Sequence, residues 1–459
     1  MEDSRTRRRQ AREARARKNR ARLRVLLGIV ALAAVAFAAW KMIPGLIPEP
    51  EPELPPEPEY TVVPDMEAER WVDISVRCAG DVMAHTGQTD SARRDKGAYY
   101  NWEEHFKYVA PYMMDADLTM ANLETTLKGA PPYLGYPSFN APDSLGWKLK
   151  NMGVDVAIFA NNHMFDLGLK TTERTVDALR SMGMQVVGAQ HAGEKRYQIV
   201  DVKGIKIGVV AYTYETPRNG GRRTINAGVL SDDAYSVINS FTQDSQELLD
   251  RDLAVIAQQM QAARDDGAQV VILYMHWGEE YQKDPNRWQK YMAQKMANAG
   301  ADVIFASHPH VIQAIEELRV NLPDGSAKNV PVFYSMGNFI SNQRTESLSG
   351  DFGTAIAAKT EQGMIACVGL RVCVNDGRHE ITEVSFIPTW VDRYSKGSTY
   401  EYGIIPLTKG FESNPMLMTS GHVSRAQAAL KSMTDLIGEK YVNTEAFDGN
   451  TARFPKDHR

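Results

Sequence analysis

The chain has 459 residues, 43% of them hydrophobic and 24% charged, which is enough apolar material for one large domain or two to three ordinary ones. The net charge of −5 is the sum of a basic N-terminal segment and an acidic remainder. Residues 1–24 contain eleven Lys or Arg and three acidic residues, a net charge of +8, so the remaining residues have a net charge of −13. The cysteines exclude a disulfide scaffold, since Cys367 and Cys373 would lie about 20 Å apart along one predicted strand and only Cys78 remains.

The first predicted element is a membrane-spanning helix over residues 25–43. Its first sixteen residues are uncharged and rich in Ala, Val and Leu, and at about 1.5 Å per residue they span about 24 Å, which Arg24 and Lys41 extend by snorkelling. The positive-inside bias places the basic tail, residues 1–24, in the cytoplasm and the body outside a cell membrane that is crossed once. A cleaved signal peptide and a nucleic-acid-binding arm are the alternatives, but the adjoining apolar span argues against nucleic acid.

Residues 44–70 form a predicted stalk. Seven of the sixteen residues from 44 to 59 are Pro and most of the others are Glu, so the segment has few amide donors and little apolar mass. Such a sequence forms an extended polyproline-type spacer of about 3.1 Å per residue. It separates the anchor from a main domain over residues 71–393, and residues 394–459, which carry no recognisable motif, form a C-terminal extension.

Five apolar runs in the main domain each end in a side chain that can ligate a divalent cation. They cover residues 74–79, 118–121, 154–159, 270–275 and 303–306. Buried parallel strands have this continuous apolar character, and their carboxyl ends meet at one edge of a sheet, where ligands bind. The third run leads, before a predicted helix over residues 171–182, into a polar turn that contains Asn161, Asn162, His163 and Asp166.

The remaining predicted elements surround these strands. The segment 129–142 is too rich in Pro and Gly for regular structure, and it is either a loop that flanks a substrate cleft or a packed connection. Further helices are expected at residues 99–112, 252–266, 289–299 and 423–437. Further strands are expected at 205–212, 330–334, 364–374 and 380–387, the last two of them antiparallel.

Six motifs, in the same order along residues 72–393, resemble the CapA family of bacterial capsule (poly-γ-glutamate) synthesis proteins. They are Gly-Asp-Val-Met at 80–83, Asn-Leu-Glu at 122–124, Ala-Asn-Asn-His at 160–163 with Asp166 and Gly168, His-Trp-Gly at 276–278, Ser-His-Pro-His-Val at 307–311 and Tyr-Ser-Met-Gly-Asn-Phe at 334–339. The resemblance implies the fold of the calcineurin-like metallophosphoesterases, an α/β four-layer sandwich of two β-sheets flanked by helices.

The resemblance also implies a metal centre and a catalytic pair. Two divalent cations, of Mn, Zn or Fe, are expected on six ligands, namely Asp81, Glu124, Asn162, His276, His308 and His310. His163 is the expected general acid, and Asp166 is expected to orient it. Asn122 and Asn338 are expected to contact the substrate.

Two features of the sequence leave alternatives open. The family pattern places a His two residues after its first Asp, whereas this chain has Met83 there, and His85 is either a substitute ligand or an exposed loop residue. Arg218, Arg222 and Arg223 occur in a short Gly-rich loop. That loop is either an anion-binding lid, with Arg222 and Arg223 on the substrate, or a solvated surface.

The resemblance implies a protein of capsule or poly-γ-glutamate synthesis anchored in the bacterial cell membrane with its main domain outside, and a metal-dependent hydrolase or transferase is the expected activity. The expected substrate is a phosphoester or an anionic polymer, and the expected partners are other capsule-synthesis membrane proteins. Two alternatives remain: a non-catalytic metal-containing scaffold of a synthesis or export complex, and an extracytoplasmic phosphoesterase unrelated to capsule. The full ligand set with His163 and Asp166 favours catalysis, whereas Met83 favours a weakened site.

Overall fold

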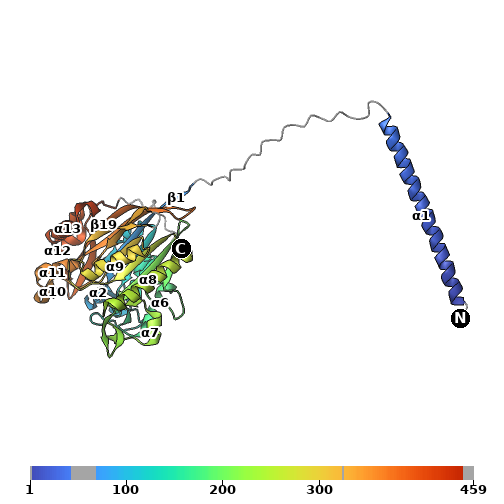
Figure 1. The fold of residues 1–459 in the computed structure, drawn as a ribbon. Helices are drawn as coiled ribbons and strands as arrows, with labels where there is room; N and C mark the ends of the chain where they lie inside the picture. Colours follow the sequence, from blue (N-terminus) through green and yellow to red (C-terminus); the bar gives the residue numbers. More distant parts are fainter. Residues whose placement is uncertain (1–2, 43–68, 323–324, 448–459) are drawn as a thin grey trace. The chain divides into compact units, whose positions relative to one another are not determined.

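A computed structural model describes residues 3–42, 69–322 and 325–447 (Figure 1), so the predicted stalk lies almost wholly outside the described residues. The chain divides into two units, Met1–Ala68 and Glu69–Arg459. The first contains helix α1 (Asp3–Lys41). Within it, Arg12–Lys41 is the one described helix that is long and apolar enough to cross a membrane, judged by length and composition. Such a helix near an N-terminus is either a membrane anchor or a signal sequence.

Two large sheets form the centre of the second unit. Sheet I has eight strands, with β17 (Asn338–Ile340) beside β1 and the order β20 (Thr399–Pro406), β19 (His379–Lys396), β18 (Gln362–Cys373), β1 (Trp71–Val82), β4 (Leu118–Leu123), β5 (Val156–Ile158) and β6 (Gln185–Val187). Sheet II has seven strands, with β7 (Tyr197–Val202) beside β8 and the order β12 (Ser240–Phe241), β8 (Ile205–Tyr214), β13 (Val270–His276), β14 (Val303–Ser307), β16 (Ala327–Phe333) and β15 (Ile315–Asn321). The central strands of both sheets run parallel, from β1 through β4 and β5 to β6 and from β8 through β13 to β14.

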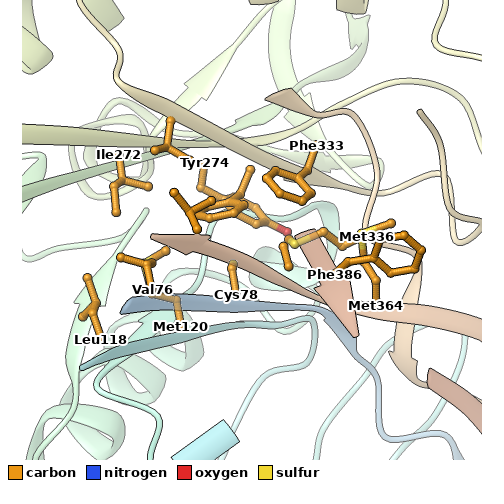
Figure 2. Packing of buried hydrophobic residues seen from close by; sticks show 14 of the residues in the cluster. Val76, Cys78, Leu118, Met120, Ile272, Tyr274, Phe333, Met336, Met364 and Phe386 are labelled. Atoms are coloured by element: carbon orange, nitrogen blue, oxygen red, sulfur yellow. The ribbon is translucent and has the colours of Figure 1, made fainter. Parts of the chain in front are cut away.

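The two sheets pack face to face. Side chains of β1 and β4, including Val76 and Met120, meet Ile272 and Tyr274 of β13 and Phe333 of β16 in one buried cluster (Figure 2). Helices cover the outer faces, with α5 (Ser144–Asn151) and α6 (Leu169–Ser181) on sheet I and α8 (Gln246–Asp265) and α9 (Arg287–Asn298) on sheet II. The predicted four-layer sandwich of two sheets flanked by helices is therefore confirmed.

Residues beyond 393 continue the same fold. The predicted boundary between residues 393 and 394 falls inside β19, and β20 pairs with β19 in antiparallel register. Helix α13 (Val423–Ile437), at the positions predicted for it, packs against β19 (Figure 1). The predicted antiparallel pairing of the strands at 364–374 and 380–387 is confirmed by β18 and β19.

The helix predicted over residues 99–112 is wrong. The structure has strand β3 (Tyr99–Tyr100) followed by two short helices, α3 (Glu103–Phe106) and α4 (Ala110–Met114). The Asn101 side chain accepts a hydrogen bond from the Glu103 amide, which starts α3 there. Pro111 occurs in the first turn of α4, where its missing N–H is tolerated, and this favours a new helix start over a continuous helix.

Candidate functional site

The carboxyl ends of the central strands of both sheets meet at one place. β1 carries Asp81 near its end and β4 leads into Glu124, while β13 ends with His276 and β14 leads into His308. All seven residues of β13 are buried, so this apolar strand fixes His276 at its end. His276 Nε2 lies 3.5 Å from Glu124 Oε1, which shows that the two sheets contribute to one cluster.

The donors of this cluster form two groups of three that share Glu124. Ligand atoms of Glu124, His308 and His310 lie within 4.8 Å of one another, and so do those of Asp81, Glu124 and His276. All five side chains are buried. Carboxylates and imidazoles at these separations are the donors that divalent first-row metals accept, so the cluster indicates a divalent metal site.

The state of the donor atoms supports this reading. Glu124 Oε1, His276 Nδ1 and His308 Nδ1 are buried and have no hydrogen-bond partner in the described part of the chain. A buried polar atom left unpaired costs about 1–3 kcal/mol, and a bound cation would supply the missing interactions. The sixth predicted donor, Asn162 Oδ1, lies 2.9 Å from His276 Nε2. The residues present therefore fit divalent metal ions.

Burial and mutual contact set the charges of the donors. Burial lowers the pKa of His276 to about 3 and holds the pKa of His308 well below its ordinary value, so both imidazoles are neutral, which is the form that binds metals. Burial and the neighbouring Asp81 raise the pKa of Glu124. For His310 burial alone would lower the pKa, but the Asp81 carboxylate at 3.3 Å outweighs it and raises the pKa of His310.

The two histidines that flank Pro309 have strained backbones. His308 has φ of 112° and His310 has φ of 56°, values that non-glycine residues seldom adopt. Such conformations cost on the order of 1–3 kcal/mol each and concentrate at functional sites, where surrounding contacts hold them. The Tyr281 amide provides one such contact, because it donates a hydrogen bond of 2.8 Å to the Pro309 carbonyl.

The predicted catalytic pair is present in hydrogen-bonding geometry. His163 Nδ1 and Asp166 Oδ2 lie 2.7 Å apart. Asp166 also accepts hydrogen bonds from the Phe139 amide at 2.7 Å and from Asn226 Nδ2 at 2.8 Å. An acceptor at Nδ1 favours the tautomer with its proton on Nδ1, so Nε2 is the nitrogen left for a substrate.

Asn122 and Asn338, the predicted substrate contacts, are fully buried and hydrogen-bond to predicted metal ligands. Asn122 Nδ2 donates to Asp81 Oδ1 at 2.8 Å, and Asn338 Oδ1 lies 3.1 Å from His310 Nδ1. These contacts orient the carboxylate and the imidazole. A direct contact of either amide with substrate stays a prediction.

The Arg-rich segment is a hairpin of β9 (Thr216–Asn219) and β10 (Arg222–Ile225) rather than a loop. Arg223 is held by Glu215 at 2.6 Å and by Asp252 at 3.2 Å, which neutralises its charge, and Arg222 is exposed. The segment contacts the His163–Asp166 pair through Asn226, in the turn before β11 (Gly228–Val229). The sequence Asn-Ala-Gly after a short strand was the available signal for that turn.

A cavity of about 430 Å³ opens beside the cluster, and Met83, His85, His163 and His310 line one part of it. His85 packs its ring 5.0 Å from that of Phe139, so it is not an exposed loop residue. In the Pro-rich segment 129–142, Tyr136 lines the cavity and Phe139 is fully buried, and its role beside a substrate stays a prediction. The remaining lining residues include Glu280, Tyr281, Asp351 and Phe352, which no sequence motif indicated.

Among the proteins similar to this chain are two solved structures and two curated proteins. The match to a novel phosphatase from Mycoplasma pneumoniae covers 70% of this chain and 94% of the phosphatase chain, with 14% sequence identity and a TM-score of 0.37. The match to TT1561 of Thermus thermophilus covers 68% of this chain and 99% of the TT1561 chain, with 9% sequence identity and a TM-score of 0.31. The capsule biosynthesis protein CapA of Bacillus anthracis is 26% identical over 280 residues, which are 59% of this chain and 60% of that protein. The PGA biosynthesis protein CapA of Bacillus subtilis is 26% identical over 276 residues, 59% of this chain and 64% of that protein.

The chain thus spans less than two thirds of the length of either curated relative. The family described as bacterial capsule synthesis protein PGA_cap matches residues 75–343, more than half of the chain. That range contains every residue of the donor cluster and the His163–Asp166 pair. The chain belongs to the bacterial capsule synthesis protein PGA_cap family.

Proposed function

We propose that this chain is a membrane-anchored, extracytoplasmic hydrolase or transferase of capsule polymer synthesis that depends on divalent metal ions. The observation that carries the proposal is the sharing of Glu124 by two buried donor groups beside the His163–Asp166 pair. A purely structural metal site needs neither a shared carboxylate nor an adjacent proton donor that borders a cavity. Helix α1 and its basic first half support the anchor and the topology.

The cluster would hold two divalent ions on Asp81, Glu124, Asn162, His276, His308 and His310. Bound ions would polarise a phosphoryl or carbonyl oxygen of the substrate and make a bound water more acidic. His163, which borders the cavity, would act in its imidazolium form, donating the Nε2 proton to the leaving oxygen or nitrogen and keeping the Nδ1 proton in its hydrogen bond to Asp166. Asp166 would keep the imidazole oriented and stabilise its protonated form between turnovers. The proposed substrate is a phosphoester or the amide of an anionic polymer, and the proposed partners of the chain are other capsule-synthesis membrane proteins.

A second candidate function rests on Met83. This thioether lines the cavity at the position where the related pattern has a His, so one metal position lacks a strong ligand. A weakened site favours a scaffold in which the metal centre holds polymer without cleaving it. The two candidates differ in turnover, because both predict bound metal and only the first predicts cleavage.

The test is metal analysis of the purified full-length chain, with turnover of p-nitrophenyl phosphate and of poly-γ-glutamate before and after chelation. Catalysis predicts bound divalent metal and a turnover that chelation abolishes and metal restores. A chain that retains stoichiometric metal but cleaves neither substrate would favour the scaffold. Cleavage of the phosphoester by a chain whose deletion leaves capsule unchanged would favour a phosphoesterase outside capsule synthesis.

A further inference from the structure

The cavity beside the donor cluster has a second part that the proposed chemistry leaves unused. It is lined by Tyr136, Tyr281 and Phe352 and by the carboxylates of Glu280 and Asp351. These five residues are termed the outer cleft. Because the same cavity is lined by His163 and His310, a group bound in the outer cleft lies next to the reacting centre.

The aromatic side chains of the outer cleft are available to a ligand. Tyr136 is 75% exposed and Phe352 is 46% exposed, so both side chains can contact a ligand that enters the cavity. The Tyr281 and Phe352 ring centroids lie 4.4 Å apart, so the two rings form one wall. Gln343 Nε2 donates to the Tyr281 hydroxyl at 3.2 Å and fixes that ring.

The charge of the outer cleft has one sign. Glu280 and Asp351 are acidic, and the cavity lining contains no Lys or Arg among the residues that the structure describes. Glu280 Oε1 lies 4.0 Å from His310 Nε2, and its side chain keeps 45% of its surface exposed. Glu280 faces one buried imidazole and Asp351 has no ion pair within the described residues, so the outer cleft disfavours an anionic polymer chain and attracts a cation.

We propose that the outer cleft binds an organic ammonium group of the substrate, next to the bond that is cleaved. Aromatic faces attract an ammonium group through their quadrupole, and nearby carboxylates add to that attraction, whereas an anion or a neutral group gains neither. The inference rests on the proposed function for the identity of the reacting centre. It adds that the substrate carries positive charge beside the scissile group, either as an amino end of a polyamide or as an alkylammonium phosphodiester.

The test is the binding of choline and of its neutral carbon isostere, 3,3-dimethylbutan-1-ol, to the purified full-length chain in dodecyl maltoside. We expect choline to bind at least about 10-fold more tightly. Phe352→Ala should weaken choline binding by about 3- to 10-fold, the usual value of one cation–π contact. Glu280→Gln combined with Asp351→Asn should bring the preference for choline below about 3-fold.

A matched control lies in the loop after Glu280. Asp284 is an exposed carboxylate, paired at 3.6 Å with Lys283, and does not line the cavity, so Asp284→Asn should keep the full preference. Equal binding of choline and its isostere would overturn the proposal and favour a neutral ligand such as a sugar. A preference that survives removal of both carboxylates and of Phe352 would overturn it as well.

Two chromogenic substrates distinguish the sources of the ammonium group. Cleavage of p-nitrophenylphosphorylcholine that choline inhibits identifies the alkylammonium phosphodiester. Cleavage of γ-glutamyl-p-nitroanilide, but not of its N-acetylated form, identifies an amino end. If neither substrate is cleaved, but the outer-cleft variants still lower the preference for choline, the proposed catalytic function is contradicted and the ammonium-binding site is supported.

Discussion

Asn226 Nδ2 donates a hydrogen bond of 2.8 Å to Asp166 Oδ1 across 60 residues of sequence. The Asp166 side chain is 1% exposed, and its other oxygen, Oδ2, faces the Phe139 amide and His163 Nδ1. Three donors therefore hold one carboxylate, and through it the imidazole that borders the cavity. The small sheet of β9, β10 and β11 contributes to the site through this amide. Of its arginines, Arg218 pairs with Asp244, Arg223 pairs with Glu215 and Asp252, and Arg222 is exposed.

Asn226→Ala should lower turnover about 10-fold without removing metal, because it frees Asp166 to rotate away from His163 but leaves the donor cluster intact. Asn226→Asp should be worse, since a second carboxylate repels Asp166. Steady-state kinetics with metal analysis of the same samples measures both effects. Asn219→Ala, at an exposed position of the same hairpin, is the control. An equal loss of turnover in that variant would show that turnover depends on the hairpin as a whole rather than on the hydrogen bond between Asn226 and Asp166.

Glu124 should be the residue whose loss removes most metal, because both donor groups contain it. We expect Glu124→Gln to abolish bound metal, and His276→Ala, which belongs to one group, to lower it less. Metal at about a hundred- to thousandfold excess over its Kd raises the free energy of unfolding by about 3 to 4 kcal/mol. Chelation should therefore destabilise the wild-type protein and leave the stability of Glu124→Gln unchanged. Thermal unfolding with and without chelator measures this effect. Glu247→Gln, at an exposed position, is the control and should behave as the wild type. Retention of all metal by Glu124→Gln would contradict the shared-ligand arrangement.

A second buried charge cluster, distant from the site, predicts how stability depends on pH. His379 Nε2 lies 3.0 Å from Asp302 Oδ1, and burial alone would lower the pKa of His379, but the Asp302 carboxylate outweighs burial and raises it. Burial would likewise raise the pKa of Asp302, but His379 and Lys328 hold it below its usual range. The His379 contribution is therefore complete below about pH 6.5 and lost as the pH rises through its raised pKa, and the Asp302 contribution is present above about pH 4 and lost on acidification.

Urea unfolding at pH 6 and pH 9 tests this sign. The wild type should lose more stability between the two values than His379→Asn does, because the variant has no imidazolium to deprotonate. Asp302 keeps Lys328 at 2.5 Å in the variant, so the fold should persist. His191→Asn, which removes a half-buried histidine paired with Asp177, should follow the wild-type curve. Parallel losses in the wild type and in His379→Asn would refute the assignment.

The topology predicts a protection pattern. Protease added outside intact cells should degrade the body and leave a fragment of about 40 residues that contains the basic tail and the apolar helix. Immunoblots with tags at each end would show this pattern. Full protection of the C-terminal tag would contradict an extracytoplasmic body.

The sheet strands and the donor cluster were predictable from sequence for a physical reason. Buried parallel strands read as continuous apolar runs, and their carboxyl ends must meet, so the residues after each run converge without any knowledge of the loops. His276 at the end of β13 is the simplest example. The structure brings all six predicted donors together, although their role as ligands stays a prediction.

Residues outside those strand ends were harder to predict. Asn226, Glu280 and Phe352 reach the site from a hairpin, a loop and helix α10 (Thr345–Phe352), and their positions depend on long-range packing that leaves no periodic signal. The Arg222 and Arg223 assignment followed from local composition, which could not show that Glu215 and Asp252 take the charge of Arg223. The broken helix at residues 99–112 is a similar case. Trp102, Phe106 and Val109 have the spacing of one helix face, which favours a single helix, whereas Asn101 and Pro111 set new helix starts.

The most direct test of the metal-dependent catalytic function is turnover and metal content of His163→Asn beside the wild type. If His163 donates a proton to the leaving group, the variant should keep its metal and lose turnover by about 10² to 10⁴, while Asp166→Asn should lose about 10- to 100-fold. Asn162→Ala and His310→Ala should lose metal and turnover together. Full capsule formation in cells that carry His163→Asn, with none in cells that carry His310→Ala, would show that the centre binds or holds without catalysing and would contradict the account.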